Sequence, residues 1–218
     1  MENSIITLLK NKILNNKKMT EKQINILEAS VDLFSQKGFA NTSTSEIAKR
    51  AKVAEGTIFK HFKNKDNLLI ATILPLLSDD IFSQIATEFQ EKALKSDHVD
   101  FDGFIESLVR NRLDFINENN KMIKIFIDSI LYKKETREKF ISLIPKDVIK
   151  SLNNVLNTFK NKKLIVDWPN SVIIRFMVTN LISYGLYKYT LFPDNNWDDE
   201  EEIYYITKFL VKGLSFNS

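Results

Sequence analysis

The chain contains no cysteine, and among its 218 residues glycine, proline and histidine occur only 5, 4 and 2 times. Without cysteine, a disulfide framework, a thiolate metal site and a cysteine nucleophile are all excluded. The two histidines, His61 and His98, are too few for a histidine metal site, so we expect no metal and no other cofactor. So little glycine and proline argues against an all-β protein, which needs many tight turns. These absences favour an all-α protein of a reducing compartment.

Long apolar runs are also missing. The apolar patch at residues 5–9 is short and follows the acidic Glu2, whereas a signal peptide begins with basic residues. The most apolar later stretch, residues 172–178, is interrupted by Arg175 and falls far short of the roughly 18 residues that span a bilayer. We therefore expect a soluble, cytoplasmic protein without a membrane partner.

Apolar residues are nevertheless plentiful, and the charge is unevenly distributed. Hydrophobic residues make up 44% of the chain and include 16 Phe, which is ample for a packed core. Residues 1–65 hold 12 Lys/Arg against 6 Asp/Glu, a balance of +6, and the remaining 19 against 22 give −3, which together make the net charge of +3. A basic front section favours contact with a polyanion. The alternative is that the asymmetry merely reflects solvated, charged faces.

The first helix of the pattern begins after Thr20. Thr20 and Gln23 have the spacing of a capping box, in which each side chain satisfies a backbone N–H at the helix start. Gly38 stands where a left-handed residue would end this helix. The apolar residues of its inner face are Ile24, Leu27, Val31 and Phe34. The preceding residues 1–19 are a basic N-terminal extension, either a short amphipathic helix or a frayed tail.

Two shorter helices follow, separated by a tight turn. Ser43 and Glu46 form a second capping box, with Thr42 as a competing N-cap. A turn at residues 52–54 then leads to a helix at residues 55–62. Two helices joined by so short a connection fit a helix-turn-helix, whose second helix enters the major groove of DNA.

Within residues 24–69, a series of residues has the order and spacing of a known family. Its members are Ala29, Leu33, Phe34, Gly38, Phe39, Thr42, Ile47, Ala48, Ala51, Val53, Gly56, Thr57, Ile58, Phe59, His61, Phe62, Lys65 and Leu68. The series resembles the DNA-binding domain of the TetR/AcrR family of bacterial regulators and covers about a fifth of the chain. The resemblance implies a helix-turn-helix DNA-binding domain of three helices at residues 20–67. It also implies a helical effector-binding and dimerisation domain at residues 68–218.

Two residues of the turn depart from the family. The family usually has Gly where Lys52 stands and a hydroxyl N-cap where Ala54 stands. A left-handed conformation at Lys52 costs roughly 1 kcal/mol, and a missing side-chain cap costs about 0.5–2 kcal/mol. Neither departure prevents the fold, and both leave the reading helix less rigid.

The resemblance also assigns roles toward DNA. Residues at the start of the reading helix face the bases, and later residues contact phosphates. The residues carried over by position are Thr44, Ser45, Glu55, Gly56, Thr57, Phe59, Lys60, His61 and Lys65. The structural alternatives are that His61 is an ordinary surface residue and that Phe59 belongs to the core. Because the reading helix lacks Arg, Asn and Gln, DNA shape is expected to supply part of the specificity.

The rear of the chain is helical but carries no motif. Apolar periodicity predicts helices near residues 77–94, 101–116, 121–132, 136–143, 145–159, 170–191 and 198–214. Pro75 is expected to bend or end the fourth helix, and the Asn-rich residues 117–120 are expected to break the chain between two helices.

Relatives hold an effector among the middle helices and dimerise through the last two. The side chains expected to line an effector pocket are Phe104, Leu108, Arg112, Phe115, Phe126, Ile127, Ile130, Phe176, Asn180 and Tyr184. The alternative is that these aromatic stripes form plain core. The side chains expected at a homodimer interface are Val172, Phe176, Thr179, Ser183, Tyr187, Ile206, Phe209 and Leu210. Such broadly apolar helices need more cover than one chain readily provides.

The resulting hypothesis is a TetR-like dimeric transcriptional regulator. It acts as a repressor that leaves a roughly palindromic operator on double-stranded DNA when an apolar or amphipathic small molecule binds. The alternative is an architectural or cell-division regulator of the same fold without an effector. No nucleophile–base pair or metal spacing supports an enzyme.

Overall fold

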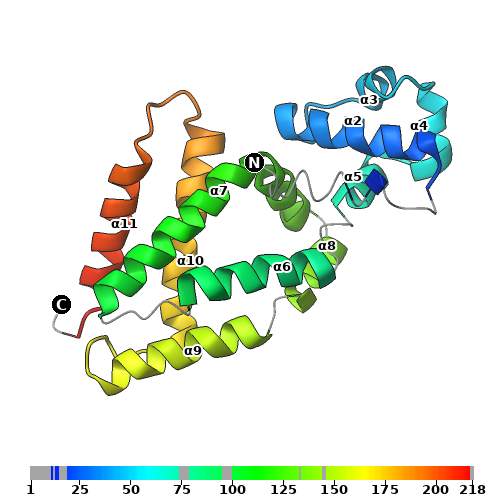
Figure 1. Ribbon diagram of the computed structural model, residues 1–218. Coiled ribbons are helices and arrows are strands. Elements are labelled where there is room, and N and C mark those ends of the chain that lie inside the picture. Colours follow the sequence, from blue (N-terminus) through cyan, green and yellow to red (C-terminus); the bar gives the residue numbers. More distant parts are fainter. Residues whose placement is uncertain are drawn as a thin grey trace. The chain divides into compact units, whose positions relative to one another are not determined.

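The computed structural model confirms an all-α fold. It describes residues 11, 13–14, 19–73, 79–94, 100–132, 134–143 and 146–216. The α-helices of these residues are α2 (Glu21–Lys37), α3 (Thr44–Arg50), α4 (Glu55–Phe62), α5 (Lys65–Ile73), α6 (Asp79–Phe89), α7 (Phe101–Tyr132), α8 (Lys134–Leu143), α9 (Lys146–Asn161), α10 (Asn170–Leu186) and α11 (Asp199–Leu214) (Figure 1). Two π-helical segments, η2 (Gln90–Leu94) and η3 (Tyr187–Leu191), continue α6 and α10. No helix within these ranges is long and apolar enough to cross a membrane.

The chain divides into two compact units by its internal contacts. The first unit comprises Met1–Phe82 and Asn119–Ile144, and the second comprises Ser83–Glu118 and Pro145–Ser218. Helices α6 and α7 each contribute residues to both units. Pro75 and His98 lie outside the described residues, as do most of residues 1–19.

In the first unit, α2 packs on α3 and α5, and α4 packs on α3 and α5. Both expected capping boxes are present, at Thr20 and at Ser43. Thr42 does not cap α3; its buried hydroxyl donates to the Gly38 carbonyl at 2.8 Å. Gly38 ends α2 with a φ of 79°, as its position predicted. The side chains that these helices bury completely or almost completely are Ile26, Leu27, Val31, Phe34, Ile47, Ile58, Leu68, Leu69 and Ile73.

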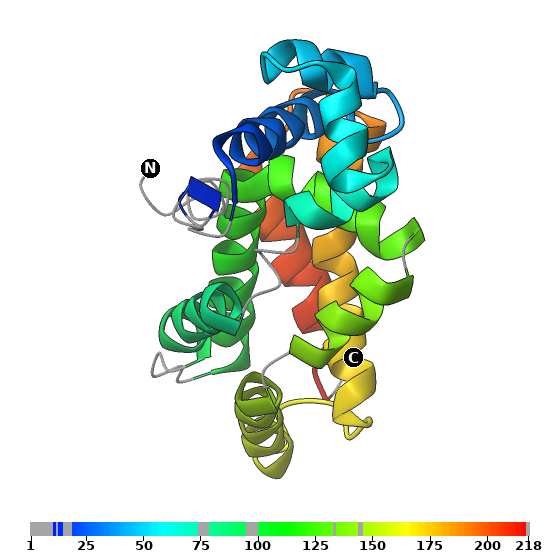
Figure 2. The same ribbon diagram turned by 90° about the vertical axis from the view of Figure 1, so that its right-hand side faces the viewer.

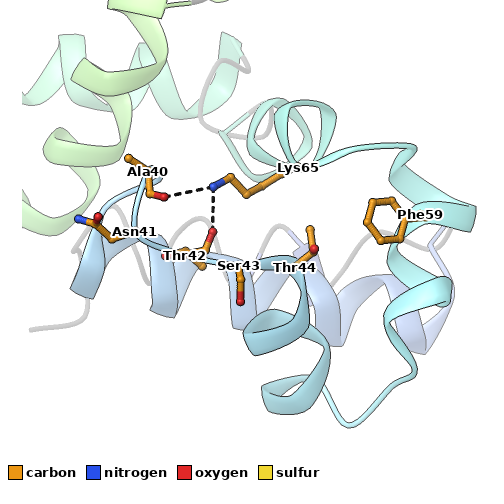
Figure 3. Close-up of a pocket in the computed structure, with 7 residues that line it drawn as sticks. All are labelled: Ala40, Asn41, Thr42, Ser43, Thr44, Phe59 and Lys65. Carbon is orange, nitrogen blue, oxygen red and sulfur yellow. Dashed lines mark hydrogen bonds between the residues drawn. The ribbon is translucent and has the colours of Figure 1, made fainter.

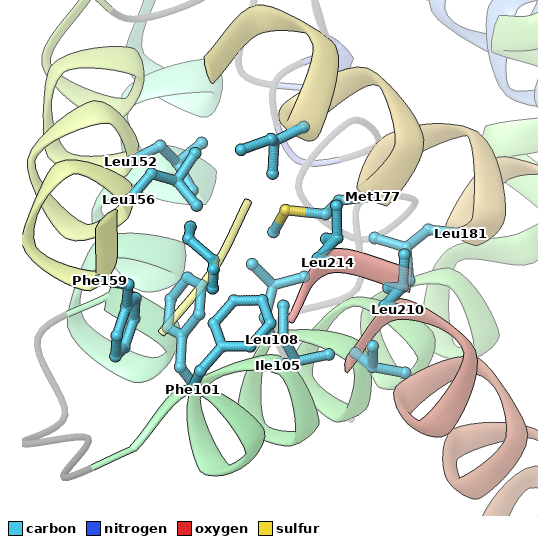
Figure 4. Close-up of a cluster of buried hydrophobic side chains, with 14 of the residues drawn as sticks. Phe101, Ile105, Leu108, Leu152, Leu156, Phe159, Met177, Leu181, Leu210 and Leu214 are labelled. Carbon is cyan, nitrogen blue, oxygen red and sulfur yellow. The ribbon is translucent and has the colours of Figure 1, made fainter. Parts of the chain in front are cut away.

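In the second unit, the front part of α7 packs with α9, α10 and α11 around one apolar core (Figure 4). The ring of Phe159 lies 5.4 Å from that of Phe101 and 5.5 Å from that of Phe104. Fully burying one such side chain stabilises a fold by roughly 1.5–3 kcal/mol, so this cluster is the main source of stability in the unit. Helices α10 and α11 lie side by side in both views (Figures 1 and 2).

The break expected at residues 117–120 is present as a kink between two helical segments. The label α7 joins these two segments, which meet at Asn119, where a φ of −116° and a ψ of 15° are not helical. Asn-rich segments favour loops because the amide competes for nearby backbone groups. Asn117, just before the kink, donates to Asp199 at the start of α11, 2.9 Å away, and so ties the first segment of α7 to α11.

A polar network surrounds Asn117 in the second unit. The hydroxyls of Tyr184 and Tyr189 donate to its Oδ1 at 3.0 and 2.6 Å, and Tyr184 also bonds to Asp199 at 2.6 Å. Lys188 forms an ion pair with Asp199. Burial and the bond to Asp199 raise the pKa of Tyr184 to about 12. Burial opposes ionisation of Asp199 too, but hydrogen bonds from Lys188 and Tyr184 outweigh it and lower the pKa of that carboxyl.

Candidate nucleic-acid interface

The turn between α3 and α4 has the geometry that a helix-turn-helix requires. Lys52 adopts a φ of 56°, so the strained conformation anticipated from the sequence is present. The turn is closed by Val53 N–H, which donates to the Ala48 carbonyl at 3.0 Å. Ala54 occupies the N-cap of α4 without a side-chain hydrogen bond, as expected. The backbone therefore holds the turn despite two unfavourable residues.

Helix α4 has one buried face and one exposed face. Ile58 and Phe62 are buried, at 0% and 8% exposure, and fix α4 on the rest of the unit. Phe59 is 46% exposed, so the interpretation that it belongs to the core is wrong. The remaining α4 residues of the predicted DNA surface are exposed or half-buried: Glu55, Gly56, Thr57, Lys60 and His61. The exposed face is therefore free to enter a groove.

A hollow of about 430 Å³ lies between the start of α3 and α4 (Figure 3). It is lined by Ala40, Asn41, Thr42, Ser43, Thr44, Phe59 and Lys65. Thr44 donates to the Glu55 carboxylate at 2.6 Å and so joins α3 to α4 at its rim. Three of the residues that line the hollow, Thr44, Phe59 and Lys65, are among the DNA contacts that the sequence predicted. Ala40, Asn41 and Ser43 had not been singled out for DNA, although a loop leading into a capping box was a signal for them.

Lys65 has a role that the sequence did not indicate. Its ammonium donates to the carbonyls of Phe39 and Thr42, both at 2.8 Å, and approaches that of Ala40 at 3.5 Å. Figure 3 shows the contacts with Ala40 and Thr42. The same ammonium lies 4.4 Å from the centroid of the Phe39 ring. Since an ammonium group has three donors, these contacts occupy all of them. Lys65 therefore holds the loop that leads into α3.

Charged groups stabilise the start of α3. The Glu46 carboxylate accepts hydrogen bonds from Lys37 and from the backbone and hydroxyl of Ser43. These bonds, that from Lys37 first, lower the pKa of Glu46 to about 2. Ser45 is exposed beside this box, and Thr44 is half-buried. The carboxylate stays ionised near neutral pH and keeps the loop and the helix start in one arrangement.

The predicted effector residues whose side chains the structure describes do not converge on one site. Phe104, Leu108 and Tyr184 are buried in the core of the second unit. Phe176 is 42% exposed on α10, and Asn180 donates to its carbonyl. The side chains of Phe126, Ile127 and Ile130 lie outside the described residues. Arg112 and Phe115 remain as half-buried neighbours on α7.

The predicted dimer residues divide between an exposed face and the core. Of the predicted residues on α10, η3 and α11, five are exposed: Phe176, Thr179, Ser183, Tyr187 and Phe209. Val172 and Ile206 are half-buried. Leu210 is only 2% exposed and belongs to the core of its own chain. The sequence also missed further exposed apolar residues near this face: Trp168, Val178, Ile182, Leu186, Tyr204 and Tyr205.

An apolar hollow of about 190 Å³ opens on the second unit. It is lined by Trp168, Phe176, Phe209, Leu210, Gly213 and Leu214. In the part of the chain that the structure describes, no group of His, Asp or Glu side chains is arranged to hold a metal ion.

Comparison with known proteins finds relatives of this chain among bacterial regulators. The profile of the family described as "Bacterial regulatory proteins, tetR family" matches residues 26–72. The uncharacterized HTH-type transcriptional regulator YhgD of Bacillus subtilis (strain 168) is 27% identical over 201 residues, which cover 88% of this chain and 96% of YhgD.

Two further comparisons concern a regulator of fatty acid metabolism and a regulator whose structure holds stearoyl-CoA. The fatty acid metabolism regulator protein of the same strain is 34% identical over 77 residues, 35% of this chain and 39% of that protein. The crystal structure of the transcriptional regulator FadR from Bacillus subtilis in complex with stearoyl-CoA has a similar fold. Its TM-score is 0.58 at 18% identity, over 87% of this chain and 98% of that one.

Proposed function

Because the chain belongs to the tetR family of bacterial regulatory proteins, we propose that this transcriptional regulator is a homodimeric repressor that a small amphipathic ligand releases from its operator. The observation that carries the proposal is that α4 has one buried face and one exposed face. Ile58 and Phe62 are buried and anchor α4, whereas Gly56 and Lys60 are exposed and Thr57 is half-buried.

The exposed face of α4 suits a major groove. Gly56 has no side chain and permits a close approach, and Thr57 can donate to a base edge or offer its methyl group to thymine. Lys60 and His61 are positioned later on the helix to contact phosphates. The α3 N-terminus, with Ser45 exposed, adds backbone N–H groups of the kind that bind phosphate.

A two-fold dimer through α10 and α11 fits this role. Exposed aromatic residues such as Phe176 and Phe209 need cover, and a second copy offers an identical face. Two α4 helices would then read half-sites about one DNA turn apart, which calls for a roughly palindromic operator. The observation that supports this arrangement is the exposed apolar face of the second unit.

The effector class we propose is an amphipathic molecule with a fatty acyl chain, either a free fatty acid or an acyl-CoA. Its support is the likeness to fatty acid regulators and the stearoyl-CoA held by the Bacillus subtilis FadR structure. To release DNA, the ligand must prefer the non-binding state of the dimer, and a coupling free energy of about 1–3 kcal/mol is typical.

Selection of bound sequences from random duplex DNA tests the proposal. We expect an inverted repeat, an affinity that falls steeply with salt, and release of the selected duplex by stearoyl-CoA or stearate. A selected motif without an inverted repeat would contradict DNA binding by a two-fold dimer. A genome-wide binding map with many scattered sites and no acyl response would favour the architectural alternative.

A further inference from the structure

Arg112 on α7 places its guanidinium in an apolar setting. Its Cζ lies 4.4 Å from the centroid of the Phe89 ring and 4.8 Å from that of Phe115. Phe89 is part of the apolar core of the second unit, so the guanidinium sits at the edge of that core. Two aromatic faces stabilise a cation, but they supply no negative charge.

The hydrogen bonds of Arg112 do not neutralise it either. Its Nε and Nη2 donate to the Asn111 Oδ1, at 2.9 and 2.6 Å, and an amide oxygen carries no net charge. Among the described residues, no carboxylate lies within ion-pair distance of this guanidinium. Glu88 acts on it only from farther away and is itself paired with Lys92 at 2.7 Å. A guanidinium has five N–H donors, so three have no acceptor within the described part of the chain.

Arg110, two residues earlier on the same helix, has the opposite environment. Its guanidinium forms a two-pronged ion pair with Glu200, at 2.5 and 2.9 Å, and lies 3.6 Å from Glu106. The hydrogen bonds to Glu200 raise the pKa of Arg110, whereas burial lowers that of Arg112 to about 10. A charge withdrawn from water normally has a partner, and Arg112 has no carboxylate partner among the residues that the structure describes.

We propose that Arg112 binds the anionic group of an amphipathic ligand, a carboxylate or a phosphate, whose apolar part lies against Phe89 and Phe115. Guanidinium groups bind both anions through paired, charge-assisted hydrogen bonds. The inference rests on the proposed function, in that the ligand is its acyl effector. Beyond the proposed function, it specifies that the protein recognises the anionic end of the effector and that Arg112 makes this contact.

The inference is tested by measuring how four dodecyl compounds bind to the full-length protein. Isothermal titration calorimetry gives the affinity of each compound. The compounds are dodecanoate, dodecyl phosphate, lauroyl-CoA and the uncharged dodecanol. We expect the wild-type protein to bind the anions at least about tenfold more tightly than dodecanol, the gain expected from hydrogen bonds to a charged group. Comparison of dodecanoate with lauroyl-CoA then distinguishes a free acid from a CoA ester as the source of the anion.

The variant Arg112→Met keeps an apolar side chain between the rings and removes the charge. We expect it to lose the preference for anions and to bind dodecanol as the wild type does. Arg112→Lys should retain part of the preference. Arg110→Met is the matched control, because it removes a paired arginine from the same helix, and it should keep the full preference. Thermal unfolding of each variant confirms that it is folded.

The outcomes separate this inference from the proposed function. If the wild type binds dodecanol as tightly as dodecanoate, or if Arg112→Met keeps the anion preference, the assignment of Arg112 is overturned while an acyl effector stands. If no dodecyl compound binds at all, both the acyl effector and its anchor are overturned. Operator binding by Arg112→Met should equal that of the wild type, since the first unit carries the DNA surface.

Discussion

Lys65 uses one ammonium group to organise the loop before α3. Family resemblance makes it a phosphate contact, whereas its bonds to Phe39 and Thr42 make it a positioning residue. Replacement by arginine separates these roles, because arginine binds phosphate well but cannot reproduce a compact ammonium with three donors. We expect Lys65→Arg to lower DNA affinity about tenfold, nearly as much as Lys65→Met, by disordering the loop. Fluorescence anisotropy with the selected duplex measures both.

Lys60→Arg serves as the control, since Lys60 is exposed and its expected phosphate contact tolerates either cation. Two results together would instead identify Lys65 as a direct phosphate contact. Lys65→Arg would bind DNA as tightly as the wild type, and in Lys65→Met the slope of log affinity against log salt concentration would become shallower by about one.

Ile58 and Phe59 are adjacent residues with opposite surroundings. Ile58 is fully buried, and its replacement by Ala should lower the free energy of unfolding by about 2–4 kcal/mol. Phe59 is 46% exposed, so Phe59→Ala should cost less than about 1 kcal/mol and yet weaken DNA binding. Urea unfolding and DNA titration of the two variants provide the measurements. Equal losses of stability would show that Phe59 contributes to the core after all.

At the scale of whole elements, local signals predicted best. The capping boxes at Thr20 and Ser43 and the strained turn at Lys52 depend on neighbouring residues, and the structure contains all three. The hydrogen bond between Asn117 and Asp199 joins residues 82 positions apart, and no local pattern reveals it. For the same reason the donors of Lys65 were assigned to DNA rather than to a loop more than 20 residues away.

Broadly apolar helices limit prediction in another way. Phe209 and Leu210 are neighbours in α11, and the sequence placed both at an interface. The structure leaves Phe209 65% exposed and Leu210 only 2% exposed. When nearly every face of a helix carries apolar side chains, periodicity cannot tell which face turns inward. Packing against α7 and α10 decides it.

Asp199 ties the start of α11 to α7 and η3. Asp199→Asn removes the carboxylate from Lys188 and Tyr184 and should lower the free energy of unfolding by about 1–3 kcal/mol at pH 7. The folded-state pKa of Asp199 is lowered below its unfolded value of about 3.9. The stabilisation is therefore complete above that pH and is lost as the pH falls through the folded-state pKa.

Urea unfolding of the wild type and Asp199→Asn between pH 3 and pH 7 measures this difference. The gap between the two proteins should be constant near neutral pH and shrink at the acid end. Asp194→Asn, in the exposed loop before α11, is the control and should match the wild type throughout. A gap that persists unchanged at pH 3 would assign the effect to packing rather than to charge.

At the scale of the whole molecule, the exposed aromatic face of α10 and α11 predicts the assembly. Phe209 lines the apolar hollow with Trp168 and Phe176, and a charge at its position should keep a second copy from covering that face. We expect Phe209→Glu to sediment as a monomer at micromolar concentration. Its affinity for the full inverted repeat should then fall to that for a single half-site, because one α4 alone reaches the duplex.

The control is Ile141→Glu. Ile141 is 58% exposed on α8 in the first unit, so it tests whether any added surface charge has the same effect. We expect this variant to remain a dimer and to bind the repeat as the wild type does. A monomeric wild type would overturn the homodimer. A dimeric Phe209→Glu with full affinity would place the dimer interface elsewhere. The paired α10 and α11 faces would then have to be covered by a different partner, since apolar patches of this kind mark contact sites.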